Sequence, residues 1–209
     1  MKNTLRSLAL AGFTVATALS TIAAPRAFDF KDPKGVNAIQ FTLDSLLEPI
    51  AGTASDVFGT VSFDIADVAS TAGKVEVDAK SLKTPNSTMN DHIVGPKWLD
   101  AAKNPEISFA FSKLTDVKSV GANQWTATAT GKFTLKGVTK EITVPVKLNY
   151  LADALEKRTK PGNKGDLLVV RGEFSVQRGD YGIQPGENED KVSPVIQLSF
   201  GLVGSAPKA

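Results

Sequence analysis

Apolar and polar residues alternate with a period of two along most of this chain, and no other sequence feature restricts its fold as strongly. The clearest run goes from Trp125 to Lys136, with apolar residues and one glycine at odd positions and threonines and lysines at even positions. A strand with one buried and one solvated face gives this pattern, whereas a helix repeats every 3.6 residues. A second run covers Glu141 to Tyr150, and the short link Lys136 to Thr139 predicts a tight hairpin between the two.

Further runs of the same kind predict more strands. They lie at residues 39–43, 61–65, 75–79, 107–111, 167–177 and 196–202. Together with the first two runs they give eight strands, and Phe28 to Phe30 is expected to form a short ninth. Pro145 has no N–H group to donate to a ladder, so we expect an edge or a bulge there, on the outer face.

Three segments interrupt the alternation. Residues 46–55 predict one helical turn before Pro49 and then a loop. Residues 87–105 contain the helix-favouring stretch Trp98 to Lys103 and predict short helical turns that cap one end of the fold. Residues 156–166 are polar and predict a surface loop.

Half-apolar antiparallel strands must bury one face together. Closing the sheet on itself does so and removes exposed edges, so the pattern predicts an all-β fold, an eight-stranded antiparallel barrel with short helical capping segments. A β-sandwich is the alternative that the same alternation allows. We find no internal repeat and no interdomain linker, so residues 25–209 are expected to form one domain.

The first 24 residues have the order of a secretory signal peptide. Lys2 and Arg6 precede an apolar run from Leu8 to Leu19, and small residues follow, with a cut expected after Ala23 or the next alanine. An uncleaved membrane anchor is the alternative, but the run is short for a span. We therefore expect a periplasmic protein without an integral membrane span after cleavage.

The charge and cysteine content exclude several classes of function. Lys2 and Arg6 account for two of the 24 basic residues, so the other 22 balance the 22 acidic residues. No basic surface for nucleic acid is therefore expected. The chain has no cysteine, which excludes a lipid anchor on cysteine, thiol catalysis and a cysteine metal site.

The inward face is expected to be apolar but not uniformly bulky. Ala127 and Ala129 put little volume into the interior, and a large empty space in a core is unfavourable unless a ligand fills it. Alternatively, phenylalanines from opposite strands fill this space, and the residues alone leave both interpretations open. The positions expected to line the interior, and to contact an apolar ligand there, are Phe41, Phe63, Val77, Phe109, Phe111, Ala127, Ala129, Phe133, Val144, Val146, Phe174, Leu198 and Phe200.

Five blocks, in order, resemble motifs of the YceI-like family. They are VFGTVSFD (57–64), VEVDAKSLKT (75–84), NDHIVGPKWLDAAKNPEISFAF (90–111), GKFTLKGVTKEITVPVKL (131–148) and FSVQRGDYGI (174–183). The resemblance implies an extended lipocalin-like barrel, usually periplasmic, that binds long apolar molecules such as polyisoprenoids, quinones or related amphiphiles. The chain departs from the family pattern at Asn104, Phe133 and Tyr181. It also lacks the histidine that many members carry after their second strand, which leaves the ligand's identity open.

Few polar residues are candidates for chemistry. His92 is the only histidine, and Asp91 precedes it, but no nucleophile turn of the G-x-S-x-G type accompanies them. Their side chains are expected to bond neighbouring backbone, and by resemblance they match a family motif, which places them alternatively at the mouth of the pocket. Arg178 is a candidate to fork onto a phosphate head group, or to pair with Asp180 at a tight corner.

The sequence therefore favours a binding or carrier protein for an isoprenoid-type apolar small molecule, with no catalytic residues, no metal and no cofactor. The alternatives are a hydrolase that acts in the same pocket and a purely structural exported barrel. An outer-membrane barrel is disfavoured because aromatic residues make up only 7% of the chain and cannot form girdles. A homodimer stays open as an alternative to a monomer.

Overall fold

The computed structural model describes residues 24–208. The expected signal peptide, residues 1–24, therefore lies outside the described residues except for Ala24. Among the helices formed by the described residues, none has the length and apolar character needed to cross a lipid bilayer.

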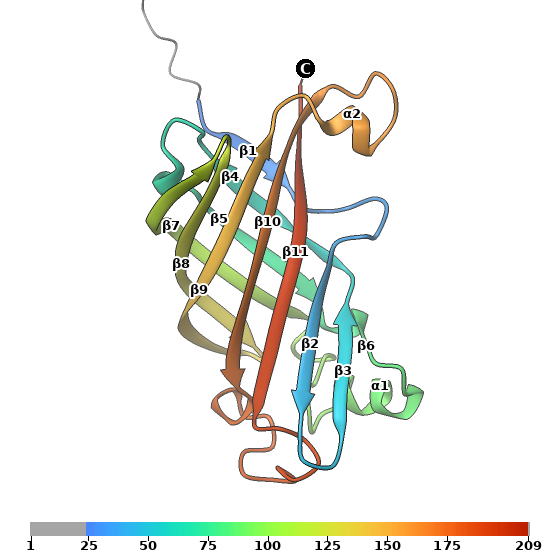
Figure 1. Ribbon diagram of the computed structural model, residues 1–209. Coiled ribbons are helices and arrows are strands. Elements are labelled where there is room, and N and C mark those ends of the chain that lie inside the picture. Colours follow the sequence, from blue (N-terminus) through green and yellow to red (C-terminus); the bar gives the residue numbers. More distant parts are fainter. Residues whose placement is uncertain (1–23, 209) are drawn as a thin grey trace, which may run out of the picture.

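Eight antiparallel strands close into a barrel (Figure 1). In spatial order they are β1 (Arg26–Asp29), β4 (Val57–Phe63), β5 (Ala72–Asp78), β7 (Glu106–Gly121), β8 (Gln124–Leu135), β9 (Val138–Leu151), β10 (Gly165–Gln177) and β11 (Val195–Pro207). The circle closes where β11 pairs with β1, at Asp29 and Ser205. This closure confirms the barrel prediction over the two-sheet sandwich.

Three more strands extend the sheet from the part of β11 that does not pair with β1. We call the sheet of barrel strands and these three strands the wall. β11 pairs with β2 (Ala38–Asp44), which pairs with β3 (Pro49–Ala54), which in turn pairs with the two-residue β6 (Leu82–Lys83). The prediction of a helical turn and a loop over residues 46–55 is thus wrong. Pro49 is the first residue of β3, where its missing N–H group is tolerated.

The wall is not paired along its whole length between β9 and β10. Their ladder runs from Leu151 to Val146 on β9 and ends opposite Gly172. Pro145 is the next residue of β9, exposed and still paired with Thr128 of β8, so it lies at a local edge as predicted.

Short helices close the ends of the strands. α1 (Ser87–Val94) begins after Asn86, whose side-chain oxygen accepts a hydrogen bond from the Met89 N–H at 3.2 Å. A helix within residues 87–105 is thus confirmed, but it precedes the helix-favouring stretch Trp98 to Lys103, which forms turns. The remaining helices are η1 (Val68–Ser70), η2 (Ala79–Ser81), α2 (Leu155–Arg158) and η3 (Arg178–Tyr181).

The expected polar loop at residues 156–166 is only partly a surface loop. It contains most of α2, and its last two residues already belong to β10. Asp166 is 1% exposed, since it accepts hydrogen bonds from the Tyr150 hydroxyl at 2.7 Å and the Asp153 N–H at 2.9 Å and pairs with Arg26. A carboxylate with that many partners can be buried at the end of a strand.

The hairpin between β8 and β9 has the expected tight turn. Its two loop residues, Lys136 and Gly137, have φ angles of 49° and 73°. Two successive residues with positive φ form the type I′ turn that matches the twist of the flanking strands. A Cβ atom at Gly137 would also lie 2.7 Å from the side-chain oxygen of Asn104.

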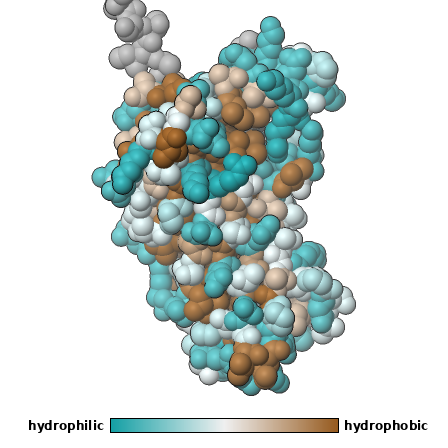
Figure 2. Space-filling view, in the orientation of Figure 1, coloured by the Kyte–Doolittle hydropathy of each residue, from teal (hydrophilic) through white to brown (hydrophobic). Residues whose placement is uncertain are grey.

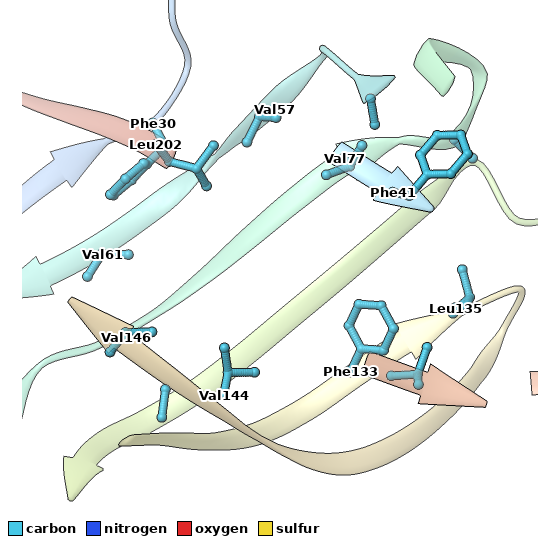
Figure 3. Packing of buried hydrophobic residues seen from close by; sticks show 14 of the residues in the cluster. Phe30, Phe41, Val57, Val61, Val77, Phe133, Leu135, Val144, Val146 and Leu202 are labelled. Carbon is cyan, nitrogen blue, oxygen red and sulfur yellow. The ribbon is translucent and has the colours of Figure 1, made fainter. Parts of the chain in front are cut away.

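The alternation seen in the sequence corresponds to the two faces of the wall. On β8, Ala127, Ala129, Phe133 and Leu135 are buried, while Lys132 between them is exposed. Hydrophilic residues cover much of the outer surface (Figure 2). Apolar side chains from different strands face the interior, among them Phe41 of β2 and Phe133 of β8 (Figure 3).

Candidate ligand cavity

Four aromatic side chains close one end of the barrel, the upper end in Figure 1, which we call the closed end. Phe63 lies at the centre, with its ring centroid 5.8 Å from those of Trp125 and Tyr150 and 6.1 Å from that of Phe28. Phe28 and Phe63 are 0% and 2% exposed. The rings fill this end without leaving space for a ligand.

Beyond these rings the barrel encloses a cavity of about 920 Å³. It extends from Phe30, Leu148 and Leu202, near the closed end, to α1 and residues 183–192 at the opposite end. Ligand pockets have volumes of roughly 300–1,000 Å³, so this cavity is large enough for one elongated small molecule. Of the two interpretations of the interior, the structure supports the hollow one.

The predicted lining residues fall almost entirely on the cavity wall. Those that line it are Phe41, Val77, Phe109, Phe111, Ala129, Phe133, Val144, Val146, Phe174, Leu198 and Phe200. Phe63 belongs to the closed end instead, and Ala127 is buried on β8 without bordering the cavity. Alternation identifies the inward face of a strand, but not how far along that face the hollow extends.

The aromatic side chains of the wall are arranged around open space. Phe109 and Phe111 stack with centroids 5.8 Å apart, and Phe174 packs edge-on against Phe133 at 5.6 Å and Phe200 at 6.4 Å. Although they point inward, all of these except Phe133 are only half-buried. They keep that exposure because they border the cavity rather than packed neighbours.

Charged side chains of the wall, together with the imidazole of His92, gather at one end, which we call the mouth. They are Glu48 after β2, Asp91 and His92 on α1, Lys97 after α1, and Lys191. Deeper in the cavity the polar lining residues include Thr71, whose hydroxyl donates to the Val68 carbonyl at 2.7 Å. A molecule inside the barrel therefore meets apolar side chains along its length and charges only at the mouth.

Asp91 and His92 lie at this mouth, both exposed on α1. Among the hydrogen bonds found between residues 24 and 208, none involves either side chain, so the expected bonds to neighbouring backbone do not form there. Across the same residues, no three histidine or acidic side chains come together in a way that could hold a metal ion.

Arg178 does not line the cavity, so the assignment of Arg178 to the polar mouth is not supported by its position. It is 1% exposed, and its guanidinium donates to the carbonyl oxygens of Ser193 (3.1 Å), Ile183 (2.9 Å) and Val192 (3.4 Å), and to those of Gln184 and Glu187. Asp180 pairs with Lys140 at 3.4 Å rather than with Arg178. The buried guanidinium therefore holds the segment 183–193 together without lining the cavity itself. Several residues of that segment line the mouth.

Sequence reasoning missed most residues of the mouth. Glu48, Lys97, Gln184 and Lys191 lie in turns between strands and helices, where no alternation exists. The only sequence signal that could have identified these residues is their position close to the ends of strands whose apolar face points into the barrel.

Residues 15–203 match the family model described as the YceI-like domain. A UPF0312 protein of Pseudomonas savastanoi pv. phaseolicola is 37% identical over 143 residues, which are 67% of this chain and 72% of that protein. Protein YceI of Salmonella arizonae is 32% identical over 142 residues, 66% of this chain and 71% of its own length.

Two solved structures have the same fold. BcnA of Burkholderia cenocepacia has a TM-score of 0.63 at 24% identity, over 80% of this chain and 95% of that one. A polyisoprenoid binding domain from Saccharophagus degradans, implicated in plant cell wall breakdown, has a TM-score of 0.63 at 12% identity, over 88% of this chain and 99% of that one.

Proposed function

This chain belongs to the YceI-like family, and on that premise we propose that it carries one isoprenoid-type molecule, such as a polyisoprenoid, a quinone or a similar amphiphile, inside its barrel. The observation that supports this proposal is the cavity of about 920 Å³, apolar along its length and charged only at its mouth. The likeness of the fold to a polyisoprenoid binding domain supports the same class of ligand.

The driving force is the transfer of apolar surface out of water. At about 0.8 kcal/mol per CH₂ group, three isoprene units contribute roughly 12 kcal/mol before costs. The loss of translational and rotational freedom costs about 4 kcal/mol or more, so the net free energy of binding is smaller than this gross value but still favourable. Since a water molecule occupies about 30 Å³ in the liquid, a cavity of about 920 Å³ accepts on the order of 30 non-hydrogen atoms.

We place the polar end of the ligand at the mouth, beside Asp91 and His92. A long amphiphile that enters an apolar cavity keeps its head where water and charges remain. If His92 contacts that head, His92→Ala weakens binding of the amphiphile but not of a wholly apolar analogue. Unchanged binding and unchanged stability would remove this role.

The proposed activity is binding without a covalent step. The alternative, a hydrolase, requires a nucleophile and a base within hydrogen-bond reach of each other. The apolar side chains along the cavity and the exposed position of His92 favour a carrier.

We also propose that the carrier acts in the periplasm after removal of residues 1–24. The basic start, the apolar run and the small residues around Ala23 support this location. N-terminal sequencing of the exported protein tests it, and a chain that still begins at Met1 would contradict it.

Binding is tested by displacement of a neutral naphthylamine fluorophore from the purified protein by prenyl alcohols of increasing length. We expect one site per chain, and an affinity that rises with each isoprene unit until the cavity is full and then levels off. An affinity that does not depend on chain length would contradict the proposal.

A further inference from the structure

Two leucines form the tip of the β2–β3 turn. Leu46 is 89% exposed and Leu47 is 59% exposed, and Leu46 is the most exposed large hydrophobic residue of the described chain. In Figure 2 a hydrophobic patch occupies the lower end of the molecule, where this turn lies in Figure 1. Exposed apolar side chains that stand next to each other are unfavourable in water and mark surfaces that contact something else.

The fold does not require leucines at this place. The last pair of the β2–β3 ladder is Asp44 and Pro49. The turn between them is held by polar contacts, because the Ser45 N–H donates to the Glu48 carbonyl at 3.2 Å and the Glu48 N–H donates to the Ser45 hydroxyl at 3.1 Å. Polar residues at the tip would leave these bonds intact.

The tip belongs to the rim of the mouth. Glu48 and Ile50, directly after it, line the cavity. On its other side, the Leu47 N–H donates to the Asp190 carbonyl at 3.1 Å, and the next residue, Lys191, lines the cavity as well. Whatever the two leucines contact is therefore adjacent to the opening through which a ligand enters or leaves.

We propose that the Leu46–Leu47 tip inserts into the surface of a zwitterionic lipid bilayer and so holds the cavity mouth against it. This inference rests on the proposed function, because a molecule that is insoluble in water passes more readily between a bilayer and a cavity that opens directly onto it. An apolar tip on an otherwise polar end is the feature that places proteins in the interfacial layer of a membrane.

The shape and the charge of the rim select this partner. Two side chains on one turn are far too small for a protein interface, which buries roughly 800 Å² on each partner, whereas a bilayer accepts a narrow tip. The exposed acidic residues Asp44 and Asp190 flank the leucines, and Glu48 follows them. Lys97 and Lys191 at the same mouth offset part of this negative charge, so the rim offers no excess of positive charge that would attract anionic lipids. Binding is therefore expected to come from the apolar tip, which zwitterionic lipids are sufficient to accept.

Sedimentation of the purified protein with phosphatidylcholine vesicles, without added ligand, tests the proposal. Burial of one leucine side chain favours binding about tenfold. We expect Leu46→Ser/Leu47→Ser to weaken vesicle binding about tenfold or more, and we expect added salt to have little effect on the wild type. Val120→Ser is the matched control, because Val120 is 61% exposed in the β7–β8 hairpin at the closed end, and its vesicle binding should equal that of the wild type.

Three results would overturn the proposal: no sedimentation of the wild type with zwitterionic vesicles, equal sedimentation of the wild type and the double variant, or tip-dependent dimers in place of vesicle binding. Uptake of the naphthylamine fluorophore from solution, measured on the wild type and both variants, distinguishes failure of the docking proposal from failure of the proposed carrier function. If only the docking proposal fails, all three proteins still take up the fluorophore. If the carrier function fails, none of them takes it up, whatever their vesicle binding.

Discussion

The side chain of Asn37 and the backbone of Val203 exchange two hydrogen bonds, as paired residues of neighbouring strands do. Asn37 Nδ2 donates to the Val203 carbonyl at 3.1 Å, and the Val203 N–H donates to Asn37 Oδ1 at 3.0 Å. The contact lies where β11 passes from its partner β2, at Gly201, to its partner β1, at Ser205. The amide of Asn37 thus takes the place of a strand residue at the junction that closes the barrel.

Replacing this asparagine should therefore destabilise the whole barrel. Asn37 is 2% exposed, and its Nδ2 also donates to the Phe30 carbonyl at 2.9 Å. Asn37→Ala leaves backbone groups of Phe30 and Val203 without partners, and we expect the free energy of unfolding to fall by about 2–4 kcal/mol. Urea denaturation measures it. Asn163→Ala, at an exposed asparagine, should change the same quantity by less than about 0.5 kcal/mol.

Asp32 makes the free energy of unfolding depend on pH in the acidic range. Burial raises the pKa of Asp32, but the N–H groups of Lys34 and Val36, the Arg158 guanidinium at 2.7 Å and the N–H of Asn37 outweigh it and hold this pKa below its ordinary value. Since the unfolded chain then binds the proton first as the pH falls, the contribution of Asp32 is complete above about pH 4 and is lost as the pH falls through the folded-state pKa.

Asp32→Asn should accordingly lower the free energy of unfolding at neutral pH, by about 1–3 kcal/mol, and flatten its decline below about pH 4. Urea titrations at a series of pH values measure both effects. Asp56→Asn is the control at an exposed carboxylate, with an expected change within about 0.5 kcal/mol. A variant with the same acid dependence as the wild type would show that Asp32 is not responsible.

Substitutions at Ala129 and Ala127 distinguish a hollow interior from a packed one. Both are buried on the inward face of β8, at 2% and 6% exposure, but only Ala129 borders the cavity. Ala129→Leu should fit into the open volume, change stability by less than about 1.5 kcal/mol and weaken ligand binding. Ala127→Leu overpacks the filled region and should cost about 1–3 kcal/mol. Equal destabilisation by both changes would indicate that the interior is packed throughout.

Arg178 should act on the mouth through the backbone that it holds. Arg178→Ala removes the donor to the carbonyls of residues 183–193, and we expect a loss of about 2–4 kcal/mol in unfolding free energy. Because the mouth loosens as a whole, binding of a neutral isoprenoid and of its diphosphate should weaken by the same factor. Arg171→Ala, at an exposed arginine of β10, the strand that ends just before Arg178, is the control. Selective loss of the diphosphate would instead restore the role of Arg178 at a head group.

The strands with unbroken alternation were predictable, and the others were not. The wall of β8 follows from the sequence because each inward residue there is apolar or glycine. β7 extends to Gly121, far beyond the predicted Phe111, because irregularities shift its register against β8 after Phe111 and again after Thr115. Such shifts move side chains between faces, so the period of two no longer marks the strand.

β3 lacked a local signal for a different reason. It begins with Pro49 and contains Gly52, both of which are typical of turns. Gly52 is needed by its neighbours, since a Cβ atom there would lie 2.3 Å from the ring of Phe41 on β2 and 2.4 Å from the Lys83 carbonyl. This requirement arises only once three strands lie side by side, and it cannot be seen in the segment alone.

The proposed carrier function requires a hollow interior that holds an isoprenoid-type lipid. Organic extraction of the protein, purified without detergent from bacteria that export it, followed by mass spectrometry of the extract, tests this most directly. We predict one prenyl-chain lipid in nearly equimolar amount to the protein, and much less of it bound to Ala129→Leu. A lipid-free extract from a correctly folded wild-type protein that also fails to take up added prenyl alcohols would contradict the account.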